Sequence, residues 1–402
     1  MKFIVLLGDG MADYPIAELG GKTPLQIANI PAMDSMAQRG TIGLASTIPP
    51  GFTPGSDVAN LSVMGYDPAV YYPGRAALEA ASIGVKLGPH DVAFRCNLVT
   101  FSRQGEKVIM DDYSAGHIKT DEARKIIEEL GKKIATDRIR FYPGVSYRHL
   151  MVWSGGEYGM ETTPPHDIIG KEISEYLPKG GGGEILRNLM AESQKVLKES
   201  PINLERISQS QKPVSSIWLW GQGRTIPMPS FRDKYGLQGG VISAVDLLRG
   251  IGITIGLETI HVPGITGYLD TNYLGKAEHA LEALNHLDFV YVHVEAPDEA
   301  AHNGDLKAKI QAIEDFDSKV VKTVLQGIKK FKDYSVMVLP DHPTPIIKRT
   351  HTSEPVPFAI FRSEDEQEKP RKGVGFDESS ASQSQIFIPK GYELMDYFLR
   401  RK

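Results

Sequence analysis

Three aspartates in this sequence follow short apolar runs, which is the position where a parallel sheet presents catalytic groups. Asp9, Asp298 and Asp341 each come at or soon after the end of such a run. Ligands bind at the carboxyl ends of the strands in open α/β sheets. Because three different strands would deliver an acid to one edge, we expect these side chains to form a shared site.

Three histidines accompany the acids. His302 follows Asp298 by one helical turn, His342 adjoins Asp341, and His351 lies beyond a proline-rich turn from which it could fold back to the same edge. Carboxylate and imidazole ligands in this mixture suit Mn²⁺ or Zn²⁺. Six such groups exceed what one open ion site needs, so two neighbouring ions fit better.

A serine completes the predicted site. Ser56 follows Thr53–Pro54–Gly55 at the expected start of a helix. Alone, such a serine is more often a helix N-cap, and Asp298 could also be one. A helix N-terminus equally favours a bound phosphate, and a serine beside a divalent ion can attack phosphorus. The joint pattern therefore favours a phosphotransfer site with Ser56 as its nucleophile.

The elements that must position these residues alternate between strand and helix, which predicts a doubly wound, mostly parallel α/β sheet. In the two outer parts of the sequence, the predicted strands are residues 3–7, 42–48, 253–262, 289–294, 334–339 and 357–360, and the predicted helices are 30–39, 275–284 and 305–330. The middle differs: it contains residues 93–101 and 150–153 as strands and 120–131 and 185–198 as helices. We therefore expect a core made of residues 1–76 and 230–402, with residues 77–229 inserted as a smaller α/β domain that binds the substrate.

Composition narrows the class of protein further. The 402 residues are 41% hydrophobic and carry a net charge of −5, which gives no basic surface for nucleic acid. The single cysteine, Cys96, lies in an apolar run and is expected to be buried. The N-terminal apolar run is too short for a signal peptide and ends in an acid, and no run is long enough to span a bilayer. We expect a cytoplasmic protein without nucleic-acid or membrane partners.

Several sequence blocks resemble the archaeal-type cofactor-independent phosphoglycerate mutases, which belong to the alkaline-phosphatase superfamily. The resemblance covers nearly the whole chain and is most specific in the blocks at residues 7–13, 53–60, 72–75, 295–302, 340–342 and 350–352. It implies an alkaline-phosphatase-like core that carries an inserted substrate domain. It also implies interconversion of 3-phosphoglycerate and 2-phosphoglycerate through a phosphoserine, by a monomer or small homo-oligomer.

The same resemblance implies how the site residues divide. Asp9, Ser56, Asp341 and His342 would hold one ion, and Asp298, His302 and His351 the other. Mn²⁺ is the usual ion, Zn²⁺, Co²⁺ and Mg²⁺ are alternatives, and no organic cofactor is needed. One block departs from the family, because many relatives have Gly-Arg-Gly-Pro where this chain has Gly74–Arg75–Ala76–Ala77.

An anionic substrate needs cations, and arginine suits carboxylate recognition. The candidates are Arg75, Arg95, Arg148, Arg224 and Lys234, with His149 as a candidate proton shuttle or a packed histidine. Two alternatives stay open. The core could serve a homoserine kinase-like enzyme or another phosphotransferase or phosphatase, or it could bind metal and phospholigands without catalysis.

Overall fold

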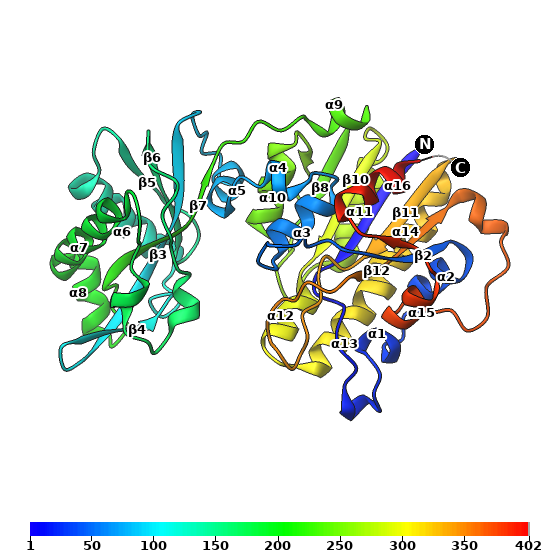
Figure 1. Cartoon of the computed structure of the whole chain (residues 1–402), viewed down its shortest axis with the longest axis horizontal. Helices are drawn as coiled ribbons and strands as arrows, with labels where there is room; N and C mark the ends of the chain where they lie inside the picture. The colour runs from blue at the N-terminus through cyan, green and yellow to red at the C-terminus, as the bar shows by residue number, and fades with distance from the viewer. Residues whose placement is uncertain (401–402) are drawn as a thin grey trace. The chain divides into compact units, whose positions relative to one another are not determined.

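The computed structural model describes residues 1–400, which form two compact units. Met1–Tyr72 and the chain from Met228 onwards form the first unit, and Pro73–Pro227 form the second. Figure 1 shows the elements of each unit. None of the described helices is both long and apolar enough to cross a membrane.

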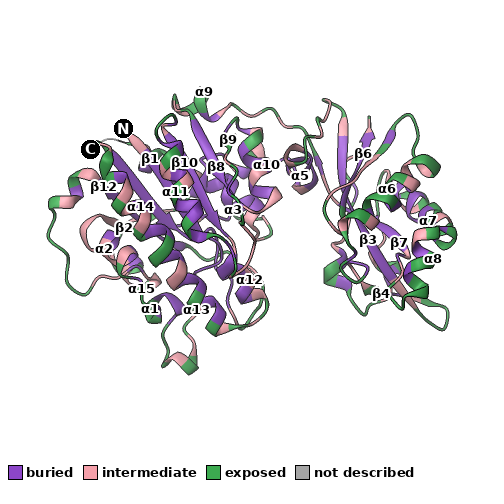
Figure 2. Ribbon diagram, turned by 180° about the vertical axis from the view of Figure 1, so that it is seen from behind, coloured by how far each residue is buried: buried purple, intermediate pink, exposed green. Residues whose placement is uncertain are grey.

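An eight-stranded sheet forms the centre of the first unit. Its strands, in spatial order, are β13 (Phe387–Ile388), β2 (Thr41–Ala45), β12 (Val356–Arg362), β11 (Tyr334–Leu339), β1 (Lys2–Gly8), β10 (Phe289–Val294), β8 (Gly239–Ile242) and β9 (Glu258–Thr259). All neighbours pair in parallel except β12, which runs antiparallel to β11 and β2. The central strands are mostly apolar because helices cover both faces, and Figure 2 shows them buried along their length.

Helices lie on both faces of this sheet. They are α1 (Pro24–Ile27), α2 (Pro31–Arg39), α3 (Ser56–Val63), α4 (Pro68–Tyr71), α9 (Phe231–Tyr235), α10 (Asp246–Thr254), α11 (Tyr273–Ala283), α12 (Ala296–His302), α13 (Leu306–Asp315), the π-helix η4 (Phe316–Val321), α14 (Lys322–Gly327), α15 (Glu378–Gln383) and α16 (Leu394–Leu399). Short 3₁₀ turns occur at Ala17–Leu19, Ile328–Lys330, Ser363–Gln367 and Gly391–Glu393.

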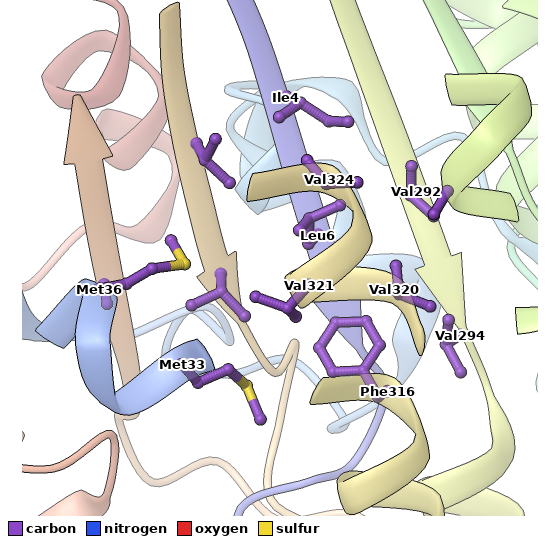
Figure 3. Close-up of a cluster of buried hydrophobic side chains, with 14 of the residues drawn as sticks. Ile4, Leu6, Met33, Met36, Val292, Val294, Phe316, Val320, Val321 and Val324 are labelled. Carbon is purple, nitrogen blue, oxygen red and sulfur yellow. The ribbon is translucent and has the colours of Figure 1, made fainter. Parts of the chain in front are cut away.

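One face of the sheet holds the main hydrophobic core. Side chains of β1, β10 and β11 pack there against α2, α11 and the continuous helical segment α13–η4–α14. Figure 3 shows Ile4 and Leu6 of β1 with Phe316 and Val320 of η4 in this cluster. The opposite face packs against other helices, as the contact of Phe3 with a ring of α16 shows.

The second unit is built on a five-stranded antiparallel sheet. Its strands are β4 (Lys107–Asp112), β3 (Asp91–Gln104), β6 (Arg148–Ser154), β5 (Ile139–Tyr142) and β7 (Ser216–Arg224), with β3 paired to β4, β6 and β7. Its helices are α5 (Arg75–Ser82), α6 (Thr120–Ile134), α7 (Gly183–Glu199) and α8 (Pro201–Ser208), with 3₁₀ turns at Pro165–Ile168 and Ile173–Tyr176. Cys96 of β3 is fully buried, and burial raises the pKa of its thiol.

The structure confirms the doubly wound, mostly parallel α/β class. The strands expected at residues 289–294 and 334–339 have those bounds as β10 and β11. The strand expected at 253–262 is wrong, because α10 extends to Thr254 and only Glu258–Thr259 join the sheet. Ile251, Ile255 and Leu257 are buried around the end of that helix, so the apolar run reflects a packed helix end and turn rather than a long strand.

Candidate metal centre

The parallel register of the central strands brings the three aspartates to one edge of the sheet. Gly8 pairs with Val294, and Leu7 pairs with Leu339, so β1, β10 and β11 end at the same level. Asp9 follows β1 directly, Asp341 follows β11 after Pro340, and Asp298 lies in the first turn of α12. Asp9, Asp298 and Asp341 are 2%, 5% and 0% exposed.

One group of possible ligands lies beside the serine. Asp9, Asp341 and His342 each place a ligand atom within 4.8 Å of the others. Ser56 Oγ lies 3.2 Å from His342 Nε2 and 3.5 Å from Asp9 Oδ2. Ser56 is the first residue of α3 after the N-cap Gly55. Its side chain therefore faces the cluster instead of capping the helix.

A second group adjoins the first. Asp298, His342 and His351 also place ligand atoms within 4.8 Å of one another. His302 Nε2 lies 3.2 Å from Asp298 Oδ2 and 2.9 Å from His351 Nε2. The structure thus brings together all seven residues predicted from the sequence, with His342 between the two groups.

Contacts outside the cluster fix how two of the histidines face it. The Arg349 carbonyl lies 3.0 Å from His302 Nδ1, so that nitrogen donates to it and Nε2 faces the cluster. Thr344 Oγ1 lies 3.2 Å from His342 Nδ1 and donates to Asp298 Oδ1 at 2.5 Å. Arg349 holds a left-handed backbone with φ 53°, which turns its carbonyl to this position.

The charges of the cluster fit a bound cation. Burial and the carboxylates of Asp341 and Asp298 hold the pKa of Asp9 well above its ordinary value. Asp9 Oδ1 is buried and accepts no hydrogen bond in the described part of the chain. Burial alone would raise the pKa of Asp298, but His302 and His351 hold it well below its ordinary value. Oxygen and imidazole donors around a buried carboxylate oxygen that accepts no hydrogen bond from the described residues suit a hard or borderline divalent ion.

Gly10 is required beside the cluster. Its φ is +63°, and a Cβ at this position would lie 2.6 Å from both Asp298 Oδ1 and Thr344 Oγ1. Its amide donates to Asp341 Oδ1 at 3.2 Å. Any larger residue would therefore strain the backbone and displace a candidate ligand.

The structure places four of the predicted substrate-binding residues as a basic set within the second unit. Arg95 is 6% exposed, forms a 2.9 Å ion pair with Glu79 and lies over the Trp220 ring. Arg75 also pairs with Glu79, at 3.4 Å. The Arg224 guanidinium lies over the ring of Tyr158, and that of Arg148 over the ring of Tyr147. Their contact with a substrate stays a prediction.

The other two candidates have structural partners. His149 is buried, and its Nδ1 accepts the Gly144 amide at 2.9 Å. Burial lowers the pKa of His149 to about 3, while Nε2 is buried without a hydrogen-bond partner among the described residues. Lys234, in the first unit, donates to the Gly65 carbonyl and lies over the rings of Tyr66 and Tyr235.

Sequence reasoning missed the side chains that support the candidate ligands. The amide nitrogen of Asn60 donates hydrogen bonds to Asp341 Oδ2, at 2.8 Å, and to the Ser56 carbonyl, at 2.9 Å. His293 contacts Asp9 Oδ2 at 2.9 Å. The available signal was the presence of Tyr291 and His293 in the otherwise apolar run of residues 289–294, because buried polar groups require partners.

The fold and the site define a class: an α/β enzyme with reactive side chains at the carboxyl edge of a mostly parallel sheet. A model of the family described as 2,3-bisphosphoglycerate-independent phosphoglycerate mutase matches residues 37–203. The probable 2,3-bisphosphoglycerate-independent phosphoglycerate mutase of Geobacter sulfurreducens is 55% identical over 402 residues, covering 100% of both chains.

Solved structures agree with this similarity. The PH0037 protein from Pyrococcus horikoshii matches with a TM-score of 0.82 and 27% identity, covering 99% of this chain and 96% of that one. The cofactor-independent phosphoglycerate mutase from Thermoplasma acidophilum matches with a TM-score of 0.66 and 26% identity, covering 99% of both chains. The chain belongs to the family of 2,3-bisphosphoglycerate-independent phosphoglycerate mutases.

Proposed function

We propose that this protein interconverts 3-phosphoglycerate and 2-phosphoglycerate without 2,3-bisphosphoglycerate, with Ser56 as the phosphoryl acceptor beside two divalent cations. The observation that carries this proposal is the position of Ser56 Oγ, 3.2 Å from His342 Nε2 and 3.5 Å from Asp9 Oδ2. The relative from Geobacter sulfurreducens bears the name of this activity and covers the full chain, which supports the same conclusion.

The candidate ligands divide into two sets around the serine. Asp9, Ser56, Asp341 and His342 would hold one ion, and Asp298, His302 and His351 the other. When bound, such ions lower the pKa of a serine hydroxyl and stabilise charge on phosphoryl oxygens. We expect Mn²⁺ to serve in this role.

Ser56 carries the phosphoryl group in the reaction that we propose. Its Oγ forms a bond to phosphorus while the bond from phosphorus to the 3-oxygen of glycerate breaks. The proton lost by Ser56 balances the proton gained by that glycerate oxygen. Glycerate then reorients, and its 2-oxygen takes the phosphoryl group back from Ser56, which regains a proton. The start of α3 supports the phosphoserine because the dipole of a helix favours a phosphate at its N-terminus.

The second unit is proposed to bind the substrate. Glycerate must stay bound while Ser56 is phosphorylated, because its loss to solvent would turn the enzyme into a phosphatase. Arginines such as Arg75, Arg95 and Arg224 could recognise the carboxylate and the phosphate. His149 is kept as a candidate for moving a proton between the two glycerate oxygens.

The assay uses purified protein with 3-phosphoglycerate and Mn²⁺, in the absence of 2,3-bisphosphoglycerate. We expect 2-phosphoglycerate to form. If none forms but phosphate is released or moved to another acceptor, the protein is a different phosphotransferase or phosphatase on the same core.

A pair of serine variants on α3 tests the nucleophile. Ser56→Ala should abolish turnover while the metal content stays near two ions. Ser62→Ala is the matched control, because Ser62 Oγ is buried on the same helix without a hydrogen-bond partner in the described chain. Turnover that survives in Ser56→Ala would show that another group accepts the phosphoryl.

A further inference from the structure

Strand β10 carries two polar side chains on one face, although both of its faces are buried. Val290, Val292 and Val294 point into the main core, so the alternation of a strand directs Tyr291 and His293 to the opposite face. Tyr291 and His293 are both fully buried. Each contacts a different member of the candidate metal centre, directly or through one other side chain.

Tyr291 determines which way the amide of Asn60 faces. The Tyr291 hydroxyl donates to Asn60 Oδ1 at 2.6 Å. The amide nitrogen of Asn60 is thereby turned towards Asp341 Oδ2, at 2.8 Å, and the Ser56 carbonyl, at 2.9 Å. The carboxylate and the carbonyl only accept, so they favour the same orientation of the amide from the other side. Without the hydroxyl, Asn60 Oδ1 loses the donor that holds it, and the amide is fixed from the Asp341 side alone.

His293 forms an equivalent contact with Asp9. His293 Nε2 lies 2.9 Å from Asp9 Oδ2. The ionised carboxylate that would hold a cation can only accept, so a neutral His293 ring beside it carries its hydrogen on Nε2. Nδ1 then accepts from the Ser243 hydroxyl at 3.2 Å, and the Val245 amide donates to Ser243 Oγ at 3.0 Å. The hydrogen bonds from Val245 through Ser243 and His293 hold Oδ2 of Asp9. They leave Asp9 Oδ1, which accepts no hydrogen bond from the described residues, to face the cluster.

We propose that β10 is the positioning strand of the site beside Ser56, with Tyr291 orienting Asp341 through Asn60 and His293 orienting Asp9. The proposal rests on the proposed function, because it assumes that Asp9 and Asp341 bind a divalent cation. Hydrogen-bonded partners of metal ligands fix ligand orientation and raise affinity, and their loss costs about 10- to 100-fold in metal affinity. Both residues act through others and need not touch substrate.

The test measures Mn²⁺ binding by calorimetry rather than turnover. Tyr291→Phe removes only the hydroxyl that contacts Asn60. His293→Leu removes the ring nitrogen that donates to Asp9, and His293→Gln restores an N–H group at that position. Ser335→Ala is the control, because it removes a buried hydroxyl on β11 of the same sheet that has no partner among the described residues. Each protein is also made with His351→Ala, which weakens the second group so that binding to the first dominates.

We expect Tyr291→Phe and His293→Leu to weaken Mn²⁺ binding about 10- to 100-fold in both backgrounds. Ser335→Ala should bind as the parent does, and His293→Gln should recover part of the loss. Circular dichroism checks that each variant is folded, and Tyr291→Phe alone decides the test if His293→Leu does not fold. The electron paramagnetic resonance spectrum of bound Mn²⁺ should change in Tyr291→Phe and not in Ser335→Ala.

Two negative results have different meanings. If the parent protein binds two Mn²⁺ ions and both β10 variants bind them equally well, the positioning role is refuted while the proposed function stands. If the parent protein binds no Mn²⁺ at all, the metal site fails and the role of β10 fails with it.

Discussion

Lys309 forms a buried ion pair that joins the two loops flanking the candidate metal centre. Its ammonium is 0% exposed and donates to Asp13 Oδ2 at 2.8 Å, to the Ala12 carbonyl at 3.2 Å and to the Thr344 carbonyl at 2.9 Å. Lys309→Met would keep most of the side-chain volume and remove all three contacts. We predict a large loss of stability in the first unit.

The magnitude follows from what the substitution leaves behind. The Asp13 carboxylate would remain buried, with the amides of Tyr14 and Ile346 as its remaining donors, at 2.7 Å and 3.1 Å. Breaking one side of a buried ion pair costs about 3–5 kcal/mol. Adding Asp13→Asn removes the unpaired charge, so the double variant should be less destabilised than the sum of the single variants, by about 1–3 kcal/mol.

Urea unfolding followed by circular dichroism measures this loss. Tryptophan fluorescence serves as an internal reference, because Trp153, Trp218 and Trp220 all lie in the second unit. Lys319→Met is the matched control: its ion pair with Asp315 is half exposed on the lysine side and should contribute less than about 1 kcal/mol. A Lys309→Met variant that unfolds within about 1 kcal/mol of the parent would refute the argument.

Three further predictions have defined outcomes. Gly10→Ala should lower turnover by at least about 100-fold. Gly21→Ala is the control and should keep the parent turnover, because Gly21 has φ +79° but no atom within 4 Å of the added Cβ. Equal effects of the two substitutions on turnover would contradict the steric argument. Arg349→Gly should keep the Mn²⁺ affinity of the parent, because glycine adopts φ 53° readily. Arg349→Val should weaken Mn²⁺ binding, because valine is disfavoured at this φ and the carbonyl of residue 349 would turn away from His302. Equal Mn²⁺ affinities of the two variants would contradict this role of the carbonyl. Burial raises the pKa of Asp317 to about 6, so its proton stabilises the fold at low pH, and this stabilisation is lost as pH rises from about 4 to about 6. The parent should therefore lose about 2–3 kcal/mol of unfolding free energy relative to Asp317→Asn over that pH range. A gain relative to Asp317→Asn would show that the pKa of Asp317 is lowered rather than raised on folding.

The sequence could predict much of the site because its signals are local. An acid at the end of an apolar run, as with Asp9 and Asp341, needs only the rule that parallel strands end at a common edge. The i, i+4 spacing of Asp298 and His302 needs only a helical turn, which α12 supplies. These residues do meet in the structure, and their role as ligands stays a prediction.

The supporting contacts depend on packing between distant segments, and the sequence did not reveal them. Asn60 meets Asp341 because α3 packs on the sheet face to which Tyr291 points, and no spacing in the sequence encodes that. The apolar residues around Ile255 indicated burial, but not whether they continue a helix or form a strand. A short apolar run is compatible with both until its neighbours are known.

The most direct test is an anomalous-scattering map from crystals of the Mn²⁺-loaded protein. We predict two Mn²⁺ peaks: one among Asp9, Ser56, Asp341 and His342, and one among Asp298, His302 and His351. A map with no peak beside Ser56 Oγ, in a protein that turns over 3-phosphoglycerate, would contradict the central claim.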